Sequence, residues 1–435
     1  MGQTVFTSTE TRMPKKNQKN ANSLAKFADR CRELLSRQQI EAGFPGSILA
    51  DIQTMIDFIG TAGIPTGSKQ GNLPTDVLPE LNARISQPVE LSLKRPLLRD
   101  YPNLAGLYIL LRVMNFARTD GKRLEIHPER RAVWDELNSA ERYFALLESW
   151  LLRASGEVIG AGYWQEGEQY SSNLEFLAGL PTKGWKAFDE WVHVSRMGLS
   201  ISPWNAQLQA RFGLIELAPL PLAARQLPIR GWMLGSARRT PWGEAAAWAV
   251  LEITGREADF FGQISAPEAA DYGFLQPAFR PFFPQWERLW LTSAPGPRSG
   301  VFIFKVSLDP RWHGGGAWRR LAVPGDTLLE SLAYDVLKAF NFDNDHLHLF
   351  KYRDQLGKAR EYHHSYMDEG PYSSEITVGE SGLPEKEAML FKFDFGDDWR
   401  FLLRLEKIAP PEENLKETRV LASEGAPPEQ YPRYE

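Results

Sequence analysis

Hydrophobic residues recur every three or four positions over much of the first half of the chain, and this spacing predicts helices. Asn138, followed three residues later by Glu141, has the form of a capping box. Pro241 suits the first turn of another helix. Two short strands are predicted over residues 123–126 and 229–236. The predicted helices cover residues 24–40, 48–59, 73–85, 103–116, 142–152, 185–194, 204–212 and 240–251.

The predicted helical part contains two successive groups of helices, and each group is followed by a short strand and one further helix. This order suits helix-turn-helix and winged-helix modules, and residues 141–152 and 212–243 resemble helicase-associated winged domains of bacterial proteins. We predict a winged-helix-like domain over residues 23–154 and a second winged-helix-like region over residues 155–254. Whether these are one domain or two stays open. Residues 1–22 are predicted to be a flexible basic tail.

Residues 255–299 are rich in aromatic side chains and prolines, and the prolines are incompatible with a regular helix. Aromatic side chains at this density normally pack on a neighbouring surface, so we predict a structured linker between the two halves of the chain. An exposed stacking platform for single-stranded nucleic acid is the alternative. The aromatic residues are Phe274, Phe279, Phe282, Phe283, Trp286 and Trp290.

After residue 300 the pattern changes to the alternation that is typical of strands. One helix is predicted over residues 328–340, capped by Asp326 or Thr327. The fold class is therefore multidomain: a mainly α, winged-helix-like N-terminal region, then an α+β domain over residues 300–435 with one main helix on a mostly antiparallel sheet. Its predicted strands cover residues 301–308, 317–324, 346–352, 376–378, 388–394 and 400–405.

Five ordered motifs in this last third resemble the plasmid pRiA4b ORF-3-like family, which is also described as insertion-element passenger proteins of the TnpR type. The resemblance implies an α+β domain connected with plasmids and mobile elements, and no established reaction. Many relatives carry a cysteine shortly before the Pro-Pro pair, and this chain has none there. The motifs are FKVSL at 304–308, WRRLAVPGDT at 318–327, DHLH at 345–348, FDFGDDW at 393–399 and APPEQ at 426–430.

Composition limits the class of protein. The 435 residues are 43% hydrophobic and contain no apolar run long enough to cross a bilayer, so no membrane span is expected. The single cysteine, Cys31, excludes intrachain disulfides and fits a cytoplasmic location. Residues 300–435 hold 17 Lys and Arg against 24 Asp and Glu, net −7, whereas the rest is +2. An acidic C-terminal domain is a poor partner for phosphate backbones.

Histidine and aspartate are concentrated in two of the family motifs. His346 and His348 alternate on a predicted strand, and together with Asp397 or Asp398 they would suit a divalent metal. With Asp394 and Asp397 as candidate catalytic carboxylates, this group suggests a metal-assisted hydrolase. The structural alternative, without a catalytic or metal-binding role, is a polar sheet face next to a hairpin turn at Gly396, with Asp394 as a paired carboxylate. No complete catalytic motif is present, so no cofactor is assigned.

The best hypothesis from the sequence is a non-enzymatic protein that binds duplex DNA or a protein partner through its N-terminal region. The metal-assisted hydrolase and a pure protein–protein adaptor are the alternatives. Oligomeric state and ligand stay open. The basic residues that are candidates for nucleic-acid binding are Arg84, Lys94, Arg95, Arg99, Arg238 and Arg239.

Overall fold

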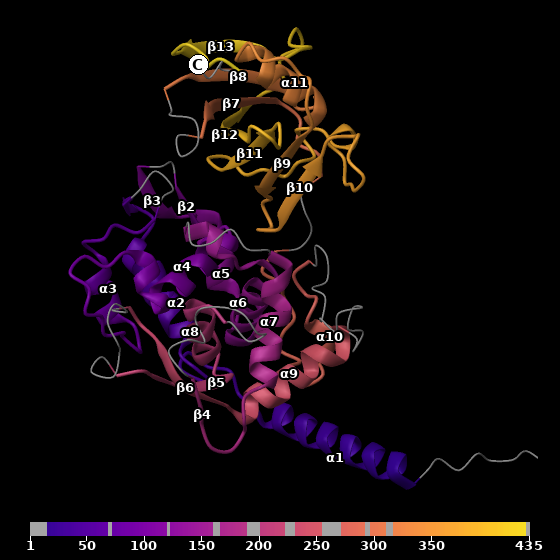
Figure 1. Cartoon of the computed structure of the whole chain (residues 1–435). Coiled ribbons are helices and arrows are strands. Elements are labelled where there is room, and N and C mark those ends of the chain that lie inside the picture. Colours follow the sequence, from indigo (N-terminus) through magenta and orange to yellow (C-terminus); the bar gives the residue numbers. More distant parts are fainter. Residues whose placement is uncertain are drawn as a thin grey trace, which may run out of the picture.

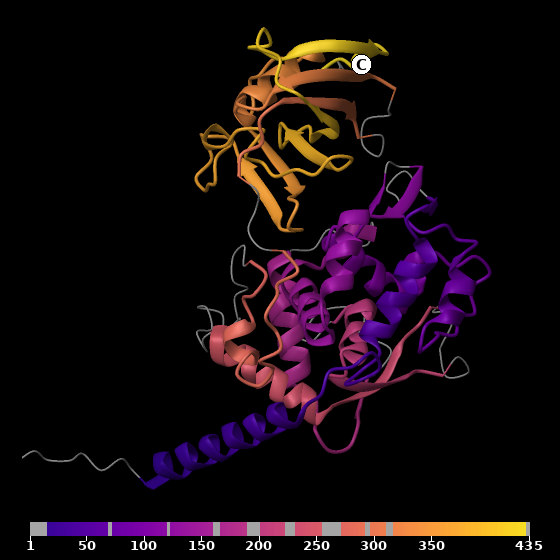
Figure 2. The same ribbon diagram turned by 180° about the vertical axis from the view of Figure 1, so that it is seen from behind.

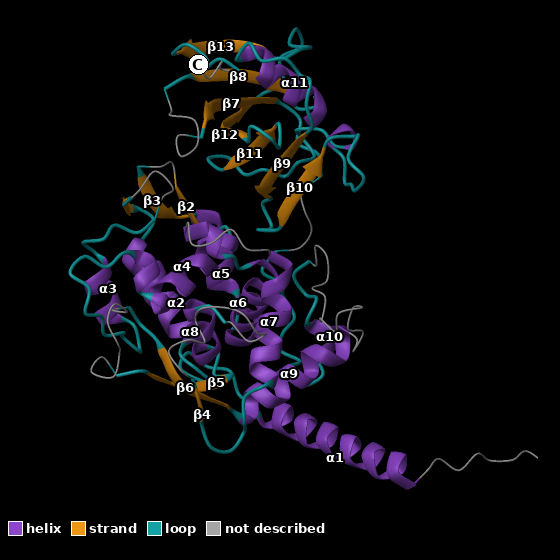
Figure 3. Ribbon diagram, viewed as in Figure 1, coloured by secondary structure: helices purple, strands orange, loops and turns teal. Residues whose placement is uncertain are grey.

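The computed structural model has a helical N-terminal part and a C-terminal part built on one large sheet, placed end to end (Figure 1). The same arrangement is seen from behind in Figure 2, and Figure 3 separates helices from strands. No helix in the described part of the chain combines the length and apolar character needed to span a bilayer. The structure describes residues 15–67, 72–119, 122–159, 166–188, 201–221, 231–254, 271–291, 296–309 and 316–431.

Most of the predicted helices are confirmed, because their signals are local. The Asn138 side chain accepts a hydrogen bond from the Glu141 N–H at 3.0 Å, and the Glu141 carboxylate returns one to the Asn138 N–H at 2.9 Å. The helices are α1 (Lys15–Arg37), α2 (Ile48–Ile59), α3 (Leu78–Arg84), α4 (Pro102–Val113), α5 (Pro128–Glu136), α6 (Ser139–Arg153), α7 (Glu166–Ala178), α8 (Pro203–Arg211), α9 (Pro241–Thr254) and α10 (Gln276–Phe279).

One predicted helix is wrong in its described part. Within residues 185–194, Lys186–Ala187 forms strand β4, and residues 189–194 lie outside the described residues. The reason is a distant partner, since Lys186 pairs with Ala237 of strand β6 (Leu234–Arg239). The small sheets have the orders β1-β3-β2 and β4-β6-β5. Their remaining strands are β1 (Ile64–Pro65), β2 (Ala117–Thr119), β3 (Arg123–Ile126) and β5 (Ile215–Pro219).

A single hydrophobic core extends from Cys31 to Trp290. It runs across the predicted boundary after residue 154, so the two predicted winged-helix-like regions share one core; the winged-helix fold itself stays a prediction. The aromatic residues of the predicted linker pack into this same core, where Trp286 stacks on Phe144 with ring centroids 4.3 Å apart. Phe279, Phe283, Trp286 and Trp290 are all buried and so do not form an exposed platform.

The C-terminal sheet is antiparallel, in the order β10-β9-β11-β12-β7-β8-β13, as predicted in outline. Helix α11 (Leu329–Ala339) packs its buried leucines and valine into the core of this part. The strands are β7 (Val301–Leu308), β8 (Trp318–Pro324), β9 (His348–Arg353), β10 (Ala359–His363), β11 (Ala388–Phe393), β12 (Trp399–Ala409) and β13 (Arg419–Glu424).

Three expectations for this sheet need correction. Leu328 precedes α11 without a side-chain cap, so neither Asp326 nor Thr327 caps the helix. Residues 376–378 do not form a strand, since Thr377 makes only an isolated bridge with Leu328 among the described residues. The edge strands β10 and β13 were not predicted, because their exposed residues lack the hydrophobic alternation of the central strands.

The turn between β9 and β10 docks on the helical part. Leu356 in this turn is buried, and its carbonyl accepts a hydrogen bond from Arg153 Nε of α6 at 3.1 Å. Arg353 Nη1 donates to the Arg153 carbonyl at 2.9 Å. Lys358 Nζ lies 2.6 Å from Asp271 Oδ1. The turn therefore fixes one end of the sheet against the helical part.

Gly357 makes this docking possible, which gives a first prediction. A Cβ there would lie 1.7 Å from the Val113 carbonyl oxygen. Gly382 has a similar left-handed backbone, φ +67° against +74°, but a Cβ there would lie 3.4 Å from its nearest neighbour. Both alanine variants carry the ~1–2 kcal/mol cost of left-handed backbone, and Gly357→Ala alone must push the turn off Val113.

We therefore expect the radius of gyration of the full chain, measured by small-angle X-ray scattering, to rise in Gly357→Ala and to stay at the wild-type value in Gly382→Ala. Equal radii for the two variants would contradict the close contact at Gly357.

A buried carboxylate in α6 gives a second prediction. Glu148 accepts hydrogen bonds from the N–H groups of Gly273 and Leu275, the latter at 2.8 Å. Burial raises the pKa of Glu148 from 4.5 to about 7. Between these values the folded chain holds a proton that the unfolded chain has lost, so the contribution of Glu148 to stability falls as pH rises through the window.

Glu148→Gln should remove this dependence. Denaturant unfolding at pH values from 4.5 to 7 should show the wild type losing stability relative to the variant as pH rises. The expected slope is at most ~1.4 kcal/mol per pH unit. Parallel curves for the two proteins would show that Glu148 does not titrate in this range.

Candidate functional site

The FDFGDDW motif forms the turn between β11 and β12, as the hairpin interpretation predicted. Asp394 and Asp398 have left-handed backbone, with φ 53° and 54°. The Asp394 carboxylate accepts hydrogen bonds from the N–H groups of Gly396 at 2.8 Å and Asp397 at 3.3 Å. Aspartate tolerates left-handed backbone and caps such turns with its own side chain. Asp394 thus has a structural role in closing the hairpin.

His346 lies beside this turn. Its Nε2 atom is 3.3 Å from Asp394 Oδ2, so the carboxylate that closes the turn also contacts a histidine. Tyr431 packs near the His346 ring and donates to Asp345 Oδ2 at 2.7 Å. Reduced solvation, followed by the carboxylate of Asp345, raises the pKa of Tyr431 to about 12. Gln430, the last residue of the APPEQ motif, donates to Asp345 Oδ1 at 3.2 Å, so three of the family motifs meet at this end of the sheet.

His348 lies in different surroundings. Strand β9 begins at His348, so His346 precedes the strand. The His348 ring is buried, with Nε2 3.0 Å from Ser373 Oγ and the ring centroid 4.7 Å from that of His364. Burial, and then the proximity of His364, lowers the pKa of His348 to about 3. The pair with Ser373 resembles a base and a nucleophile, but both residues are closed to substrate by burial.

The candidate metal ligands do not share a coordination shell in this structure. Within the described residues, no three His, Cys, Asp or Glu side chains lie close enough together to hold a metal ion. Asp397 is exposed at the tip of the turn. The Asp398 carboxylate contacts Arg400 at 2.7 Å and Lys392 at 2.9 Å. The metal site that the hydrolase hypothesis requires is therefore not formed by these residues in the described part of the chain.

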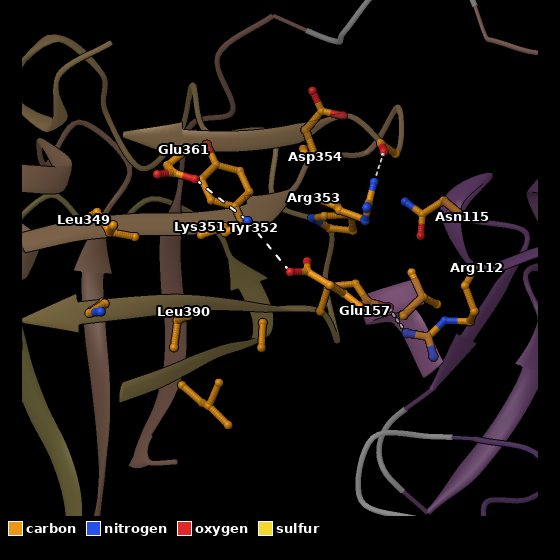
Figure 4. A pocket seen from close by; sticks show the side chains of 18 of the residues that line it. Arg112, Asn115, Glu157, Leu349, Lys351, Tyr352, Arg353, Asp354, Glu361 and Leu390 are labelled. Carbon is orange, nitrogen blue, oxygen red and sulfur yellow. Dashed lines mark hydrogen bonds and ion pairs between the residues drawn. The ribbon is translucent and has the colours of Figure 1, made fainter. Parts of the chain in front are cut away.

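A groove lies between the outer face of the sheet and the helical part, with a cavity of about 570 Å³ (Figure 4). Arg112, Asn115, Glu157 and Val158 line it from the helical part. From the sheet, the lining includes Leu349, Lys351, Arg353, Leu390, Lys392, Arg400 and Leu402. These residues stand on alternate positions of β9, β11 and β12, on the face opposite the buried core.

Two ion pairs cross the groove from one wall to the other, Lys351 with Glu157 and Arg112 with Glu387. Lys351 Nζ lies 4.0 Å from Glu157 Oε1 and 3.9 Å from Glu361 Oε2. Arg112 Nη2 lies 3.5 Å from Glu387 Oε1. Between these pairs, Leu390 and Leu402 are cross-strand neighbours and are half-buried. The groove thus has an apolar floor and a rim of opposite charges.

Sequence reasoning did not find this groove. The alternation that predicts β9 and β11 also identifies their outward positions, but it does not show that Arg112 and Glu157 lie against them. The contact between Lys351 and Glu157 joins residues that are distant in sequence. Only the docking of the β9–β10 turn brings them together.

The basic candidates for nucleic-acid binding separate into two groups. Three of them contact carboxylates: Arg84 with Glu80, Arg238 with Glu216, and Arg239 with Glu244. The other three, Lys94, Arg95 and Arg99, are exposed on the segment before α4, and the structure shows no ion pair for them within the described residues. Among these candidates, the second group is therefore the one without a carboxylate partner in the described residues.

Comparison with known proteins gives a family match for one part of the chain. The chain resembles the crystal structure of a protein of unknown function, MM3350 from Methanosarcina mazei Go1, with 25% sequence identity over 29% of this chain and 70% of that one, at a TM-score of 0.26. No curated protein matches the chain. Residues 301–432, the C-terminal third, match the family described as Plasmid pRiA4b ORF-3-like protein, which confirms the resemblance carried by the five sequence motifs.

Proposed function

We propose that the protein is a non-enzymatic protein-binding protein, and that its groove takes an extended peptide segment of a partner. The observation that carries this proposal is the cavity of about 570 Å³ with walls from both parts of the chain. Ligand sites are typically concave, lie between domains and combine an apolar lining with a few placed polar groups. The family name refers to a plasmid, which favours a partner that functions with plasmids or other mobile elements.

The floor of the groove indicates the chemistry of the segment. Leu390 and Leu402 lie side by side and are only half-buried, so an apolar side chain of the ligand would remove their remaining surface from water. Lys392 and Arg400 are also cross-strand neighbours, and both contact the carboxylate of Asp398. These three residues together carry one net positive charge, which suits an acidic residue next to the apolar one.

A third prediction follows from this arrangement. Peptides selected from a random library on the immobilised full chain should combine an apolar with an acidic residue. Leu390→Glu places a charge on the floor of the groove. It should lower the affinity for the selected peptides about tenfold or more, which is ~1.4 kcal/mol of binding free energy. Fluorescence anisotropy with labelled peptides measures the affinities.

Leu24→Glu is the matched control. Leu24 is 53% exposed on α1, so the same substitution there leaves the groove unchanged and should not alter peptide affinity. Selected peptides that bind Leu390→Glu as tightly as the wild type would refute the groove as the binding site.

Duplex DNA is a second candidate partner, favoured by the exposure of Lys94, Arg95 and Arg99 on one segment. Three basic side chains that contact phosphates release counterions, which makes binding depend strongly on salt. At Arg84, Arg238 and Arg239 a phosphate would first have to displace a carboxylate, so the segment that shows no ion pair within the described residues is the better candidate.

A fourth prediction tests this candidate by gel shift of duplex DNA at low salt. Reversal of the three charges to Glu should abolish the shift. In the wild type, log K should fall as log salt rises, and these three residues should contribute about −2.7 to that slope, at about −0.9 for each phosphate contact. The control reverses Lys183, Lys407 and Lys416, which are exposed elsewhere. No shift by the wild type, or equal loss in both triple variants, would remove the DNA candidate.

A further inference from the structure

Strand β13 forms one edge of the large sheet and, among the described residues, pairs with a strand on one side only. It is hydrogen-bonded to β8 on one side and ends the strand order of the sheet. Five of its six residues are exposed, including Val420 at 51% and Leu421 at 45%. Figures 1 and 2 both place β13 on the side of the sheet away from the helical part, so the helical part does not obstruct it.

Edge strands that resist association usually carry prolines, β-bulges or inward-pointing charges. Strand β13 has no proline, and its pairing with β8 is interrupted by a bulge between Val420 and Ala422. Its charges lie at its two ends with opposite sign: the sequence is Arg419-Val-Leu-Ala-Ser-Glu424. An antiparallel copy of this strand, centred between Leu421 and Ala422, would place Arg419 opposite Glu424. The charge pattern of the strand is therefore complementary to itself.

The faces of the sheet agree with this register. Val420 and Ser423 are paired with Leu321 and Arg319, which are buried on the α11 side, and both line the hollow beside α11. The bulge between Val420 and Ala422 puts Val420 and Ser423 on the same face although they are three residues apart. In the proposed register these two residues lie opposite each other, so each pair joins residues of the same face. Arg419 and Glu424 are paired with Ala322 and Trp318, which stand on the other face of β8.

The end residues retain capacity for a new contact. Trp318 Nε1 donates to Glu424 Oε2 at 2.7 Å, so Oε1 of the same carboxylate is the atom that would accept from arginine. The Arg419 side chain is 52% exposed and touches Glu412 at 3.1 Å, a surface pair. Exposed ion pairs of this kind contribute little to stability, so Arg419 can exchange Glu412 for another carboxylate at small cost.

We propose that β13 pairs with β13 of a second copy of this chain, antiparallel and about a two-fold axis, to join the two sheets into one. A two-fold axis requires a self-complementary surface, which is what the strand presents. Main-chain hydrogen bonds on either side of the bulge supply the attraction, and the cross-strand charge pairs set the register. A contact formed by one short strand is small, so the dimer should dissociate on dilution.

Charge exchange in the full chain tests the pairing by sedimentation velocity over a series of concentrations. The wild type should approach twice the mass of one chain as concentration rises. Glu424→Arg sets arginine against Arg419 of the copy, and Arg419→Glu sets two glutamates together, so each single variant should stay at the mass of one chain. The double variant restores opposite charges and should dimerise again.

Glu413→Arg is the control, because it makes the same charge change at an exposed residue outside the strand and should dimerise as the wild type does. Circular dichroism checks folding. If loss of the Trp318 contact unfolds Glu424→Arg and with it the double variant, Arg419→Glu, which keeps that contact, decides alone. A wild type that stays at one chain mass, folded single variants that dimerise, or a folded double variant that does not recover would overturn the proposal. So would capture of other proteins by β13 without self-association.

Discussion

The buried carboxylate of Asp354 holds the turn on which the relation between the two parts of the molecule depends. Its Oδ1 atom accepts hydrogen bonds from the N–H groups of Leu356 at 2.8 Å and Lys358 at 3.0 Å, and its Oδ2 atom accepts from Arg360. This carboxylate fixes the turn so that Gly357 meets the Val113 carbonyl. Because hydrogen bonds to a buried charge are strong, the turn is a rigid contact rather than a loose linker. The groove exists because this contact holds a helical wall beside the sheet.

The two faces of the central strands serve different purposes, and a period of two residues separates them. On β9 and β11 the inward residues include Phe350 and Phe391, whose rings stack 4.8 Å apart in the core. The outward residues of the same strands, Lys351 and Leu390, are paired in register and line the groove. A shift of one residue in either strand would exchange core and groove residues, so the packing of the core also fixes the lining of the groove.

Local signals in the sequence predicted α2, β3, β7 and the capping box at Asn138, because each depends on residues within a few positions of one another. Elements that depend on distant partners were missed: β4 exists through its pairing with β6, and β10 and β13 are exposed edges without a hydrophobic pattern. The candidate site followed the same rule. The motif residues at the β11–β12 turn were identified, and the hairpin was predicted, but the separation of His348 from His346 depends on where β9 begins.

The FDFGDDW turn is connected to the groove, because a carboxylate of the turn contacts basic side chains that line the groove. Asp394 closes the turn through its own side chain, which leaves Asp398 in left-handed backbone at the start of β12. From there the Asp398 carboxylate contacts Lys392 on β11 and Arg400 on β12, and both cations line the groove. A β11–β12 connection without a carboxylate at this position would leave the two neighbouring cations to repel each other across the strands. Two acidic residues of the motif therefore have structural explanations that need no metal or substrate: Asp394 closes the turn, and Asp398 positions basic side chains in the groove.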